Sequence, residues 1–328
     1  MTAALLGAHA QNTGRETALP TIKATSTLVA APTLVRLPSG EFVNHLSAEQ
    51  IELFDNGIRQ KVTLEEAGNR PIAVVVLMQT SGPDAGQFQN YRKLPELLES
   101  MIGQSVHEIM LVTFDSRPRA TWHFPARSDG VEYALAHPVA GDDGAAILDA
   151  VDYVTELLQQ EAGDFRRVVL LLSQSQDEGS RTSAEEVVRH LGKGNTSVYS
   201  LTFSAPKSPP HSWGKSRAAK PRAFSTGGQV DDVVDRSTPL GAAVKALRTN
   251  TADELAVLSG GAHMKFRDEP DFEKQLSAIA DDIHHRYMLS FQPDSHQPGF
   301  HTLSVRVAGQ QPHLSILART SYWFDAGN

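Results

Sequence analysis

The sequence PIAVVVLMQTS, residues 71–81, decides the fold of this 328-residue chain. It contains seven consecutive apolar residues at 72–78, four of them β-branched, and it runs into the turn-forming sequence QTSGP. A short, wholly apolar run bounded by turn signals is typical of a strand that is buried on both faces. We therefore predict that 72–78 is the central strand of a parallel sheet. The loop that follows it then lies at the edge where open α/β sheets bind ligands.

Further strands and helices alternate after this strand. The strands are predicted at 108–114, 120–123, 167–173, 197–203 and 262–266. Between them, apolar residues recur at intervals of three and four, which is typical of helices with one buried face. These helices are predicted at 87–102, 128–136, 145–160, 183–191, 240–247, 252–258 and 271–285. The alternation predicts an α/β fold over 67–285, with a doubly wound, mostly parallel, Rossmann-like sheet.

Both ends of the chain are predicted to be rich in β-strands. The strands are expected at 26–37, 51–54, 60–64, 286–291, 300–307 and 314–319. Asp55-Asn56-Gly57 is a strong turn signal between two of them. Neither end has enough strands to be stable alone. We therefore predict that 26–66 and 286–324 pair into one small β-sandwich-like module beside the α/β domain.

Composition and charge narrow the possible partners. The net charge of −8 argues against general nucleic-acid binding. The chain has no cysteine, which excludes disulfides, thiol catalysis and thiolate metal sites. No run approaches the roughly 18–20 apolar residues that a membrane span needs.

Three segments lie outside the predicted strands and helices. Residues 1–25 include Ala8-His9-Ala10, which fits the small-x-small pattern before a signal-peptide cleavage point. We expect a signal-peptide remnant followed by a disordered stretch, and hence an exported protein in the periplasm or outside the cell. Residues 205–237 are predicted to form a long loop, which is either functional or disordered, and 325–328 a short tail.

Several motifs resemble the von Willebrand factor A (VWA) domain. The TSG that follows the first α/β strand resembles the D-x-S-x-S motif of that family, and GAAILDA at 144–150 resembles its G-T-x-L-x-D-A helix start. VLLLSQSQDE at 169–178 resembles its fourth strand. The flanking motifs resemble the exported "VWFA-related" family of Acidobacteria, and they are LSAEQ at 46–50, FDNG at 54–57, LSGG at 258–261 and YMLSFQP at 287–293.

The resemblance implies a metal-ion-dependent adhesion site (MIDAS) on the loops. In the family, two aspartates, two hydroxyls after the first strand and a threonine hold Mg²⁺, whose open position takes a carboxylate from a partner. At the matching positions this chain has Gln79, Ser81, Pro83, Ala145 and Gln174. Only Ser81 keeps a family ligand, and Mg²⁺ prefers carboxylates and dehydrates reluctantly. We therefore expect a degenerate site that holds no metal, and no cofactor.

Other polar residues in the sequence are candidates for a metal site or for the surface. Acids on loops near the same edge could rebuild a metal site, although solvated acids are ordinary there; these are Asp84, Asp115, Asp142, Asp143, Asp177 and Glu178. The five histidines at 284, 285, 296, 301 and 313 are expected at the surface, and Asp281-Asp282 on a solvated face.

The function that these features predict is non-catalytic protein binding. No G-x-S-x-G, HExxH or P-loop pattern is present. We expect an adhesion-type VWA protein that holds a protein partner at the degenerate loop edge or on the β module. Two alternatives stay open: a structural subunit of an envelope assembly, and an enzyme with an unrecognised site.

Overall fold

The structure is a computed structural model that describes most of the chain. The described residues are 28–66, 70–103, 107–124, 133–134, 137, 139–160, 165–203, 238–309 and 314–325. The predicted signal-peptide remnant at 1–25, most of the predicted helix at 128–136 and the loop at 205–237 lie outside these residues, as does 326–328 of the predicted tail.

A six-stranded sheet forms the centre of the larger part of the molecule, in the order β10-β9-β8-β5-β6-β7. Its strands are β5 (Ile72–Gln79), β6 (His107–Phe114), β7 (Pro118–Phe124), β8 (Arg166–Ser173), β9 (Thr196–Phe203) and β10 (His263–Phe266). All neighbouring pairs are parallel except β6 and β7, which are antiparallel. The predicted fold class is confirmed, and β5 is an inner strand paired with β6 and β8.

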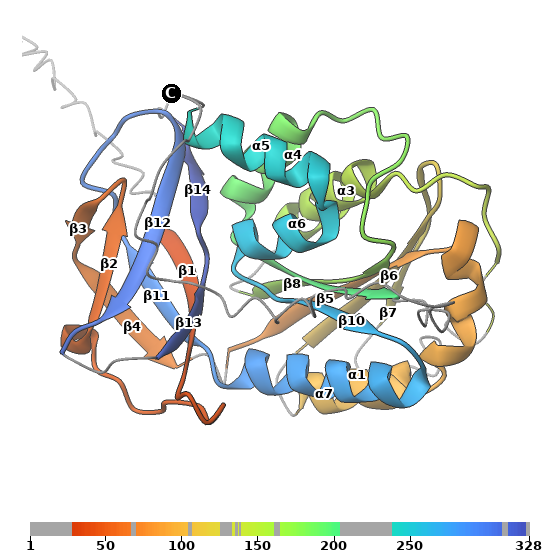
Figure 1. The fold of residues 1–328 in the computed structure, drawn as a ribbon, viewed down its shortest axis with the longest axis horizontal. Helices are drawn as coiled ribbons and strands as arrows, with labels where there is room; N and C mark the ends of the chain where they lie inside the picture. The colour runs from red at the N-terminus through yellow and green to blue at the C-terminus, as the bar shows by residue number, and fades with distance from the viewer. Residues whose placement is uncertain are drawn as a thin grey trace, which may run out of the picture.

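Helices cover both faces of this sheet (Figure 1). One face carries α1 (Leu94–Ile102) and α7 (Glu269–His284), and the other carries α3 (Ile147–Gln160), α4 (Ala184–Gly194), α5 (Pro239–Thr249) and α6 (Thr251–Ser259). Alternate residues of β5 enter the two cores: Ile72, Val74, Val76 and Met78 on one side, and Ala73, Val75 and Leu77 on the other. This is why the decisive run is apolar at every position.

The first helical segment after β5 begins differently from the prediction. Residues Gly82–Tyr91 form a 3₁₀ segment, η3, and the α-helix begins only at Leu94. Pro95 lies in the first turn of α1. Proline favours that position and disfavours helical geometry in the residue before it, so it places the helix start there.

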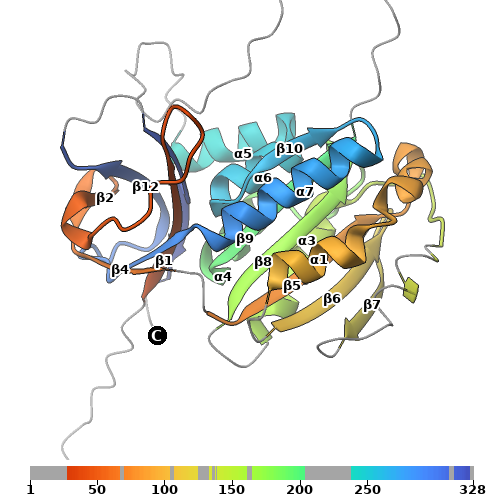
Figure 2. The same cartoon turned by 90° about the horizontal axis from the view of Figure 1, so that it is seen from below.

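The two ends of the chain pair in two four-stranded sheets (Figure 2). The strands are β1 (Val29–Arg36), β2 (Ile51–Asp55), β3 (Ile58–Gln60), β4 (Val62–Glu66), β11 (Tyr287–Phe291), β12 (Gly299–Val307), β13 (Ser315–Ala318) and β14 (Ser321–Phe324), and a 3₁₀ turn, η1 (Ala48–Gln50), precedes β2. The sheet orders are β13-β1-β11-β4 and β14-β12-β2-β3. Each sheet therefore contains strands from both ends, and apolar residues of both sheets share one core. We call these two sheets the β module.

The strand predicted at 60–64 is wrong, because the chain changes sheet within it. β3 ends at Gln60 and pairs with β2, whereas β4 begins at Val62 and pairs with β11. β14 was not predicted at all, although it packs the module against α4.

A buried arginine joins the β module to the α/β domain. Arg319, between β13 and β14, is 1% exposed. Its guanidinium donates to carbonyls of Leu191 and Gly192 in the last turn of α4 and to the Asn195 side chain. Gly260 lets the Arg319 backbone approach closely, because a Cβ at Gly260 would lie 2.6 Å from the Arg319 backbone nitrogen.

Three polar residues expected in turns or at the surface are buried instead. Asp55 accepts hydrogen bonds from His301 at 2.8 Å and from the Tyr322 hydroxyl at 2.7 Å, and all three side chains are buried. Burial and the Asp55 hydrogen bond raise the pKa of Tyr322. Asp282 is 2% exposed and pairs with Arg36. Partners that lie far along the sequence offset part of the cost of burying these groups.

Candidate functional site

The predicted site lies at the carboxyl ends of the central strands. Gln79 ends β5, Gln174 directly follows β8, and the segment 139–146 crosses the same edge before α3 begins. A backbone hydrogen bond from Gly141 to the Thr80 carbonyl, 2.7 Å long, fastens this segment to the end of β5. Parallel strands therefore bring distant parts of the sequence together at one edge, as the fold class requires.

The two amide side chains at the predicted site, Gln79 and Gln174, bind each other. The Gln79 amide nitrogen donates towards the Gln174 Oε1 atom at 3.3 Å and the Ser81 Oγ atom at 3.2 Å. The Gln79 Oε1 atom accepts from the Gln174 backbone nitrogen at 3.0 Å. The structure thus brings Gln79, Ser81 and Gln174 into one hydrogen-bonded group, which we call the amide cluster.

Ala145 lies beside this cluster without a side-chain ligand to offer. The Ser81 hydroxyl donates to the carbonyl of Gly144, and Ala145 forms a two-way backbone bridge with Glu178 at 3.1 and 2.8 Å. Pro83 lies in the first turn of η3. Ala145 is therefore held in a buried position by its backbone bonds to Glu178.

Three of the six acids that could rebuild a metal site, Asp115, Asp142 and Asp177, have other partners. Asp115 and Asp142 both pair with Arg119, at 2.6 and 3.1 Å. Asp177 accepts from the Ser180 hydroxyl at 2.6 Å and the Leu148 nitrogen at 2.9 Å. A hydrogen bond from Ser116, aided by Arg119, lowers the pKa of Asp142 to about 2. These side chains brace the loops rather than converge on one open point.

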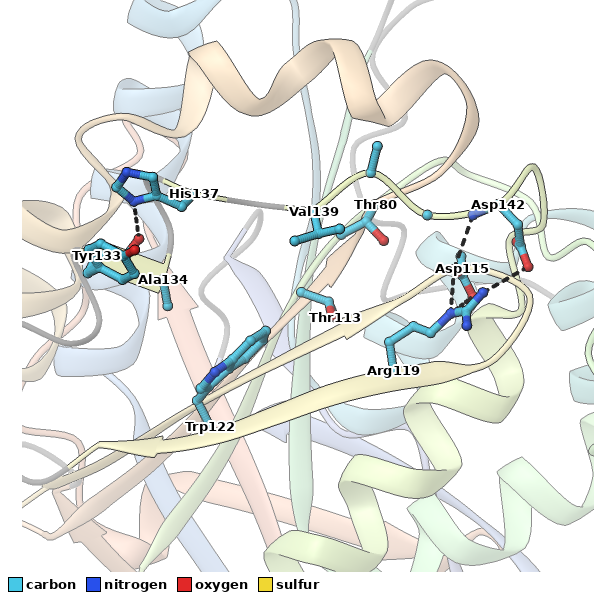
Figure 3. A pocket seen from close by; sticks show the side chains of 12 residues that line it. Thr80, Thr113, Asp115, Arg119, Trp122, Tyr133, Ala134, His137, Val139 and Asp142 are labelled. Carbon is cyan, nitrogen blue, oxygen red and sulfur yellow. Dashed lines mark hydrogen bonds and ion pairs between the residues drawn. The ribbon is translucent and has the colours of Figure 1, made fainter.

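A cavity of about 510 Å³ is lined by Thr80, the residue between Gln79 and Ser81 of the amide cluster (Figure 3). Its polar wall contains Asp115, Arg119 and Asp142, and its apolar wall includes Trp122 from β7 and Val139. Trp122 is 39% exposed and Val139 is 81% exposed. This volume lies in the range of binding pockets, which combine apolar walls with a few polar groups.

Sequence reasoning did not find this cavity. Asp115 and Asp142 were considered only as metal ligands, and Arg119, Trp122 and Val139 were not considered. The available signal was an arginine and a tryptophan close to the predicted ligand edge, at positions 119 and 122, which on a regular strand would point to opposite faces. That signal is weak, because the cavity depends on the antiparallel placement of β7 and on the segment 139–142.

A separate cluster in the described residues has metal-ligand composition. It consists of Asp152, Glu156 and His190, whose ligand atoms lie within 4.8 Å of one another. His190 Nδ1 lies 2.6 Å from Asp152 Oδ1. The cluster lies on α3 and α4, away from the amide cluster, and its histidine already has a carboxylate partner.

Among the described residues, Ser200 and His263 are a serine and a histidine in hydrogen-bond contact, the combination that a catalytic nucleophile and its general base would need. The Ser200 Oγ atom lies 2.8 Å from His263 Nδ1, but the hydroxyl donates to the Ala252 carbonyl at 2.7 Å. The imidazole therefore donates to Ser200 rather than accepting its proton. Ser200 is 0% exposed, and burial lowers the pKa of His263.

Comparisons with known proteins report likeness in fold only. A scan against protein-family models gave no match, and a search of curated proteins gave none. Among solved structures, proximal thread matrix protein 1 from the mussel byssus, with a zinc-occupied MIDAS motif, matches at 11% identity and a TM-score of 0.44. The match covers 70% of this chain and 50% of that one, so this chain spans about half of the mussel protein.

Two bacterial proteins show similar likeness. The conserved hypothetical protein BatB from Bacteroides thetaiotaomicron matches at 15% identity and a TM-score of 0.40, over 65% of this chain and 98% of that one. A mutant of the PilB minor pilin from Streptococcus sanguinis matches at 12% identity and a TM-score of 0.43, over 66% and 62%. At these identities and scores, the likenesses carry no functional argument.

Proposed function

We propose that this chain is a non-catalytic protein-binding protein of the adhesion type, with a VWA-like α/β domain whose loop edge works without a metal ion. The proposal extends to an exported protein, in the periplasm or outside the cell. No helix among the described residues is long and apolar enough to cross a membrane.

The amide cluster is the observation that carries the proposal. A cation at this edge would need free oxygen lone pairs pointing at it. Here the Gln79 amide nitrogen takes the place that a cation would have, because it donates hydrogen bonds to the oxygens of Ser81 and Gln174. The Ser81 hydroxyl proton in turn is directed at the Gly144 carbonyl. The oxygens are satisfied by protein hydrogen bonds, and no carboxylate among these residues is available to offset a divalent charge.

The cavity beside the amide cluster is the surface that we assign to the partner. Partially exposed tryptophan and arginine side chains carry much of the binding energy in protein interfaces. Trp122 and Arg119 are such residues, and Val139 extends the apolar surface outwards. A partner side chain that enters this cavity would contact both an apolar wall and the Asp115–Arg119–Asp142 network.

Site-specific photo-crosslinking of the full chain tests the proposal. A photoreactive amino acid is placed at Val139, beside the cavity, and as a matched control at Ile58, which is 57% exposed on β3 of the β module. Each protein is illuminated with intact cell envelopes, in Mg²⁺ and in a chelator. We expect one defined adduct from position 139, equal in both conditions and lost when Trp122→Ala is added.

Two results would overturn this proposal. Adducts that form only with Mg²⁺ would show a metal-dependent edge, and equal adducts from both positions would show that the loop edge is not the binding surface. Adducts from position 58 alone would favour the alternative of a structural subunit that assembles through the β module.

A further inference from the structure

Two buried arginines meet at the end of the molecule opposite the amide cluster. Arg166 is the first residue of β8, and Arg286 lies between α7 and β11, where the α/β domain passes into the β module. Arg166 is 9% exposed and Arg286 is 5% exposed. Both line a small cavity of about 30 Å³, together with Asn195, Ser197 and Tyr199.

The guanidinium groups of these arginines are only partly satisfied. Arg166 donates one Nη1 bond to the Ile283 carbonyl at 2.9 Å, and Arg286 donates one to the Gly260 carbonyl. Within the described part of the chain, the Nε atom of Arg166 and the Nε and Nη2 atoms of Arg286 are buried with no hydrogen-bond partner. A buried donor left without an acceptor is costly, and more so when it carries charge.

The charges around the cavity do not balance. The acid that acts on Arg286 is Asp282, but its carboxylate contacts Arg36. Arg70 adds a further positive charge that acts on Arg166 and pairs with Glu65 at 3.5 Å. The cavity is therefore lined by two cationic groups, and the acid that acts on Arg286 is shared with Arg36.

The remaining lining groups can also donate hydrogen bonds. Burial raises the pKa of Tyr199 to about 12, so its hydroxyl keeps its proton at neutral pH. The Asn195 Oδ1 atom accepts from Arg319 at 2.7 Å, which leaves its amide nitrogen to donate elsewhere. Ser197 supplies a hydroxyl.

We propose that this cavity is an anion site for one small inorganic anion of halide size, such as chloride. A water molecule could accept from two of the free donors, but it would not neutralise either charge. The size excludes larger ligands, because about 30 Å³ holds one or two waters or a monatomic anion, whereas organic ligands need some hundreds of Å³.

Bound there, the anion joins the two parts of the molecule. Arg166, Ser197 and Tyr199 belong to the α/β sheet, while the cavity also contacts Pro32 of β1 and Met288 of β11 in the β module. An anion that neutralises Arg166 and Arg286 together therefore stabilises the junction between them. This role is independent of the loop edge and of its proposed partner.

Melting curves of the full chain in different sodium salts test the proposal. Chloride and bromide are compared with gluconate, which is too large for the cavity, at equal ionic strength so that general screening is the same. We expect the melting temperature to rise with halide concentration and to saturate, by about 2 °C or more over gluconate. Equal melting temperatures in all three salts would overturn the proposal.

Variants and diffraction locate the effect. Arg166→Gln should abolish the halide-dependent rise, whereas Arg248→Gln, at an exposed arginine of α5, should keep it. Crystals of the unaltered chain grown in bromide give a decision even if Arg166→Gln does not fold. An anomalous peak between Arg166 and Arg286 would support the site, and a water molecule in its place would overturn it.

Discussion

Replacing Arg319 with methionine should uncouple the β module from α4. The guanidinium is fully surrounded by acceptors: it donates to Ser321 at 2.6 Å, to Asn195 at 2.7 Å and to Leu191 at 3.2 Å, and also to Ala30 and Gly192. Burial lowers the pKa of Arg319 to about 10, so it stays charged at neutral pH. Two of these acceptors end α4, where a positive charge is favourable.

The expected loss follows from the acceptors that methionine cannot satisfy. A buried acceptor left without a partner costs about 1–3 kcal/mol, and water that enters the space would satisfy some of the five. If two stay unsatisfied, Arg319→Met lowers the free energy of unfolding by about 2–6 kcal/mol. The melting temperature then falls by about 3–10 °C.

Urea denaturation with a constant slope measures this loss directly. The control is Arg306→Met, an exposed arginine on β12 that lies 5.1 Å from the Phe54 ring centroid. Because an exposed cation–π contact contributes about 0.5–1 kcal/mol, the control should lose no more than that. Equal losses in the two variants would refute the assignment of Arg319 as the residue that joins the two parts.

Three further predictions concern the loop edge, a buried acid and the β module. One variant introduces the metal ligands of the VWA family at four positions, through Gln79→Asp, Pro83→Ser, Ala145→Thr and Gln174→Asp. It should bind Mg²⁺ in a calorimetric titration and be less stable than the parent without metal, because its carboxylates repel each other. No heat in the variant would mean that the loop backbone has diverged too. Burial raises the pKa of Glu254 from 4.5 to about 7, so its ionisation destabilises the fold as the pH rises through that range. Glu254→Gln should therefore add about 1 kcal/mol at pH 8, after discounting for solvent screening, and nothing at pH 4; an equal gain at both would contradict this. Asp55→Ala should lower the free energy of unfolding by about 3–5 kcal/mol, because it leaves the buried His301 and Tyr322 without their shared partner. Glu52→Ala, which removes a surface ion pair with Arg59, should lower it by about 0–1 kcal/mol. Similar losses in the two variants would exclude a buried network.

The sequence predicted those elements whose pattern does not depend on distant contacts. The apolar run of β5 must be buried on both faces wherever it lies, and Ser183 with Glu186 forms a capping box at the start of α4. The start of α1 was misplaced because periodicity was weighed above Pro95. The change of sheet at Lys61 has no local signal, since β3 and β4 find their partners in β2 and in β11, far along the chain.

The candidate site was predictable in part for the same reason. Gln79, Ser81 and Gln174 follow strand ends in a recognisable order, so their meeting could be inferred from the fold class. Their mutual hydrogen bonds could not be inferred, because they depend on side-chain geometry. Asp55 was interpreted as a turn residue and Asp282 as solvated, since their partners His301 and Arg36 are separated from them by 246 residues in each case.

The central claim is that the loop edge works without a metal ion, and anomalous diffraction from crystals soaked in Mn²⁺ tests it most directly. Mn²⁺ takes the same oxygen ligands as Mg²⁺ and is located by its own scattering. We predict no anomalous peak in contact with Ser81 Oγ, and unchanged hydrogen bonds between Gln79 and Gln174. A peak there with an octahedral shell of oxygens, and the Gln79 amide turned to present its oxygen, would contradict the claim.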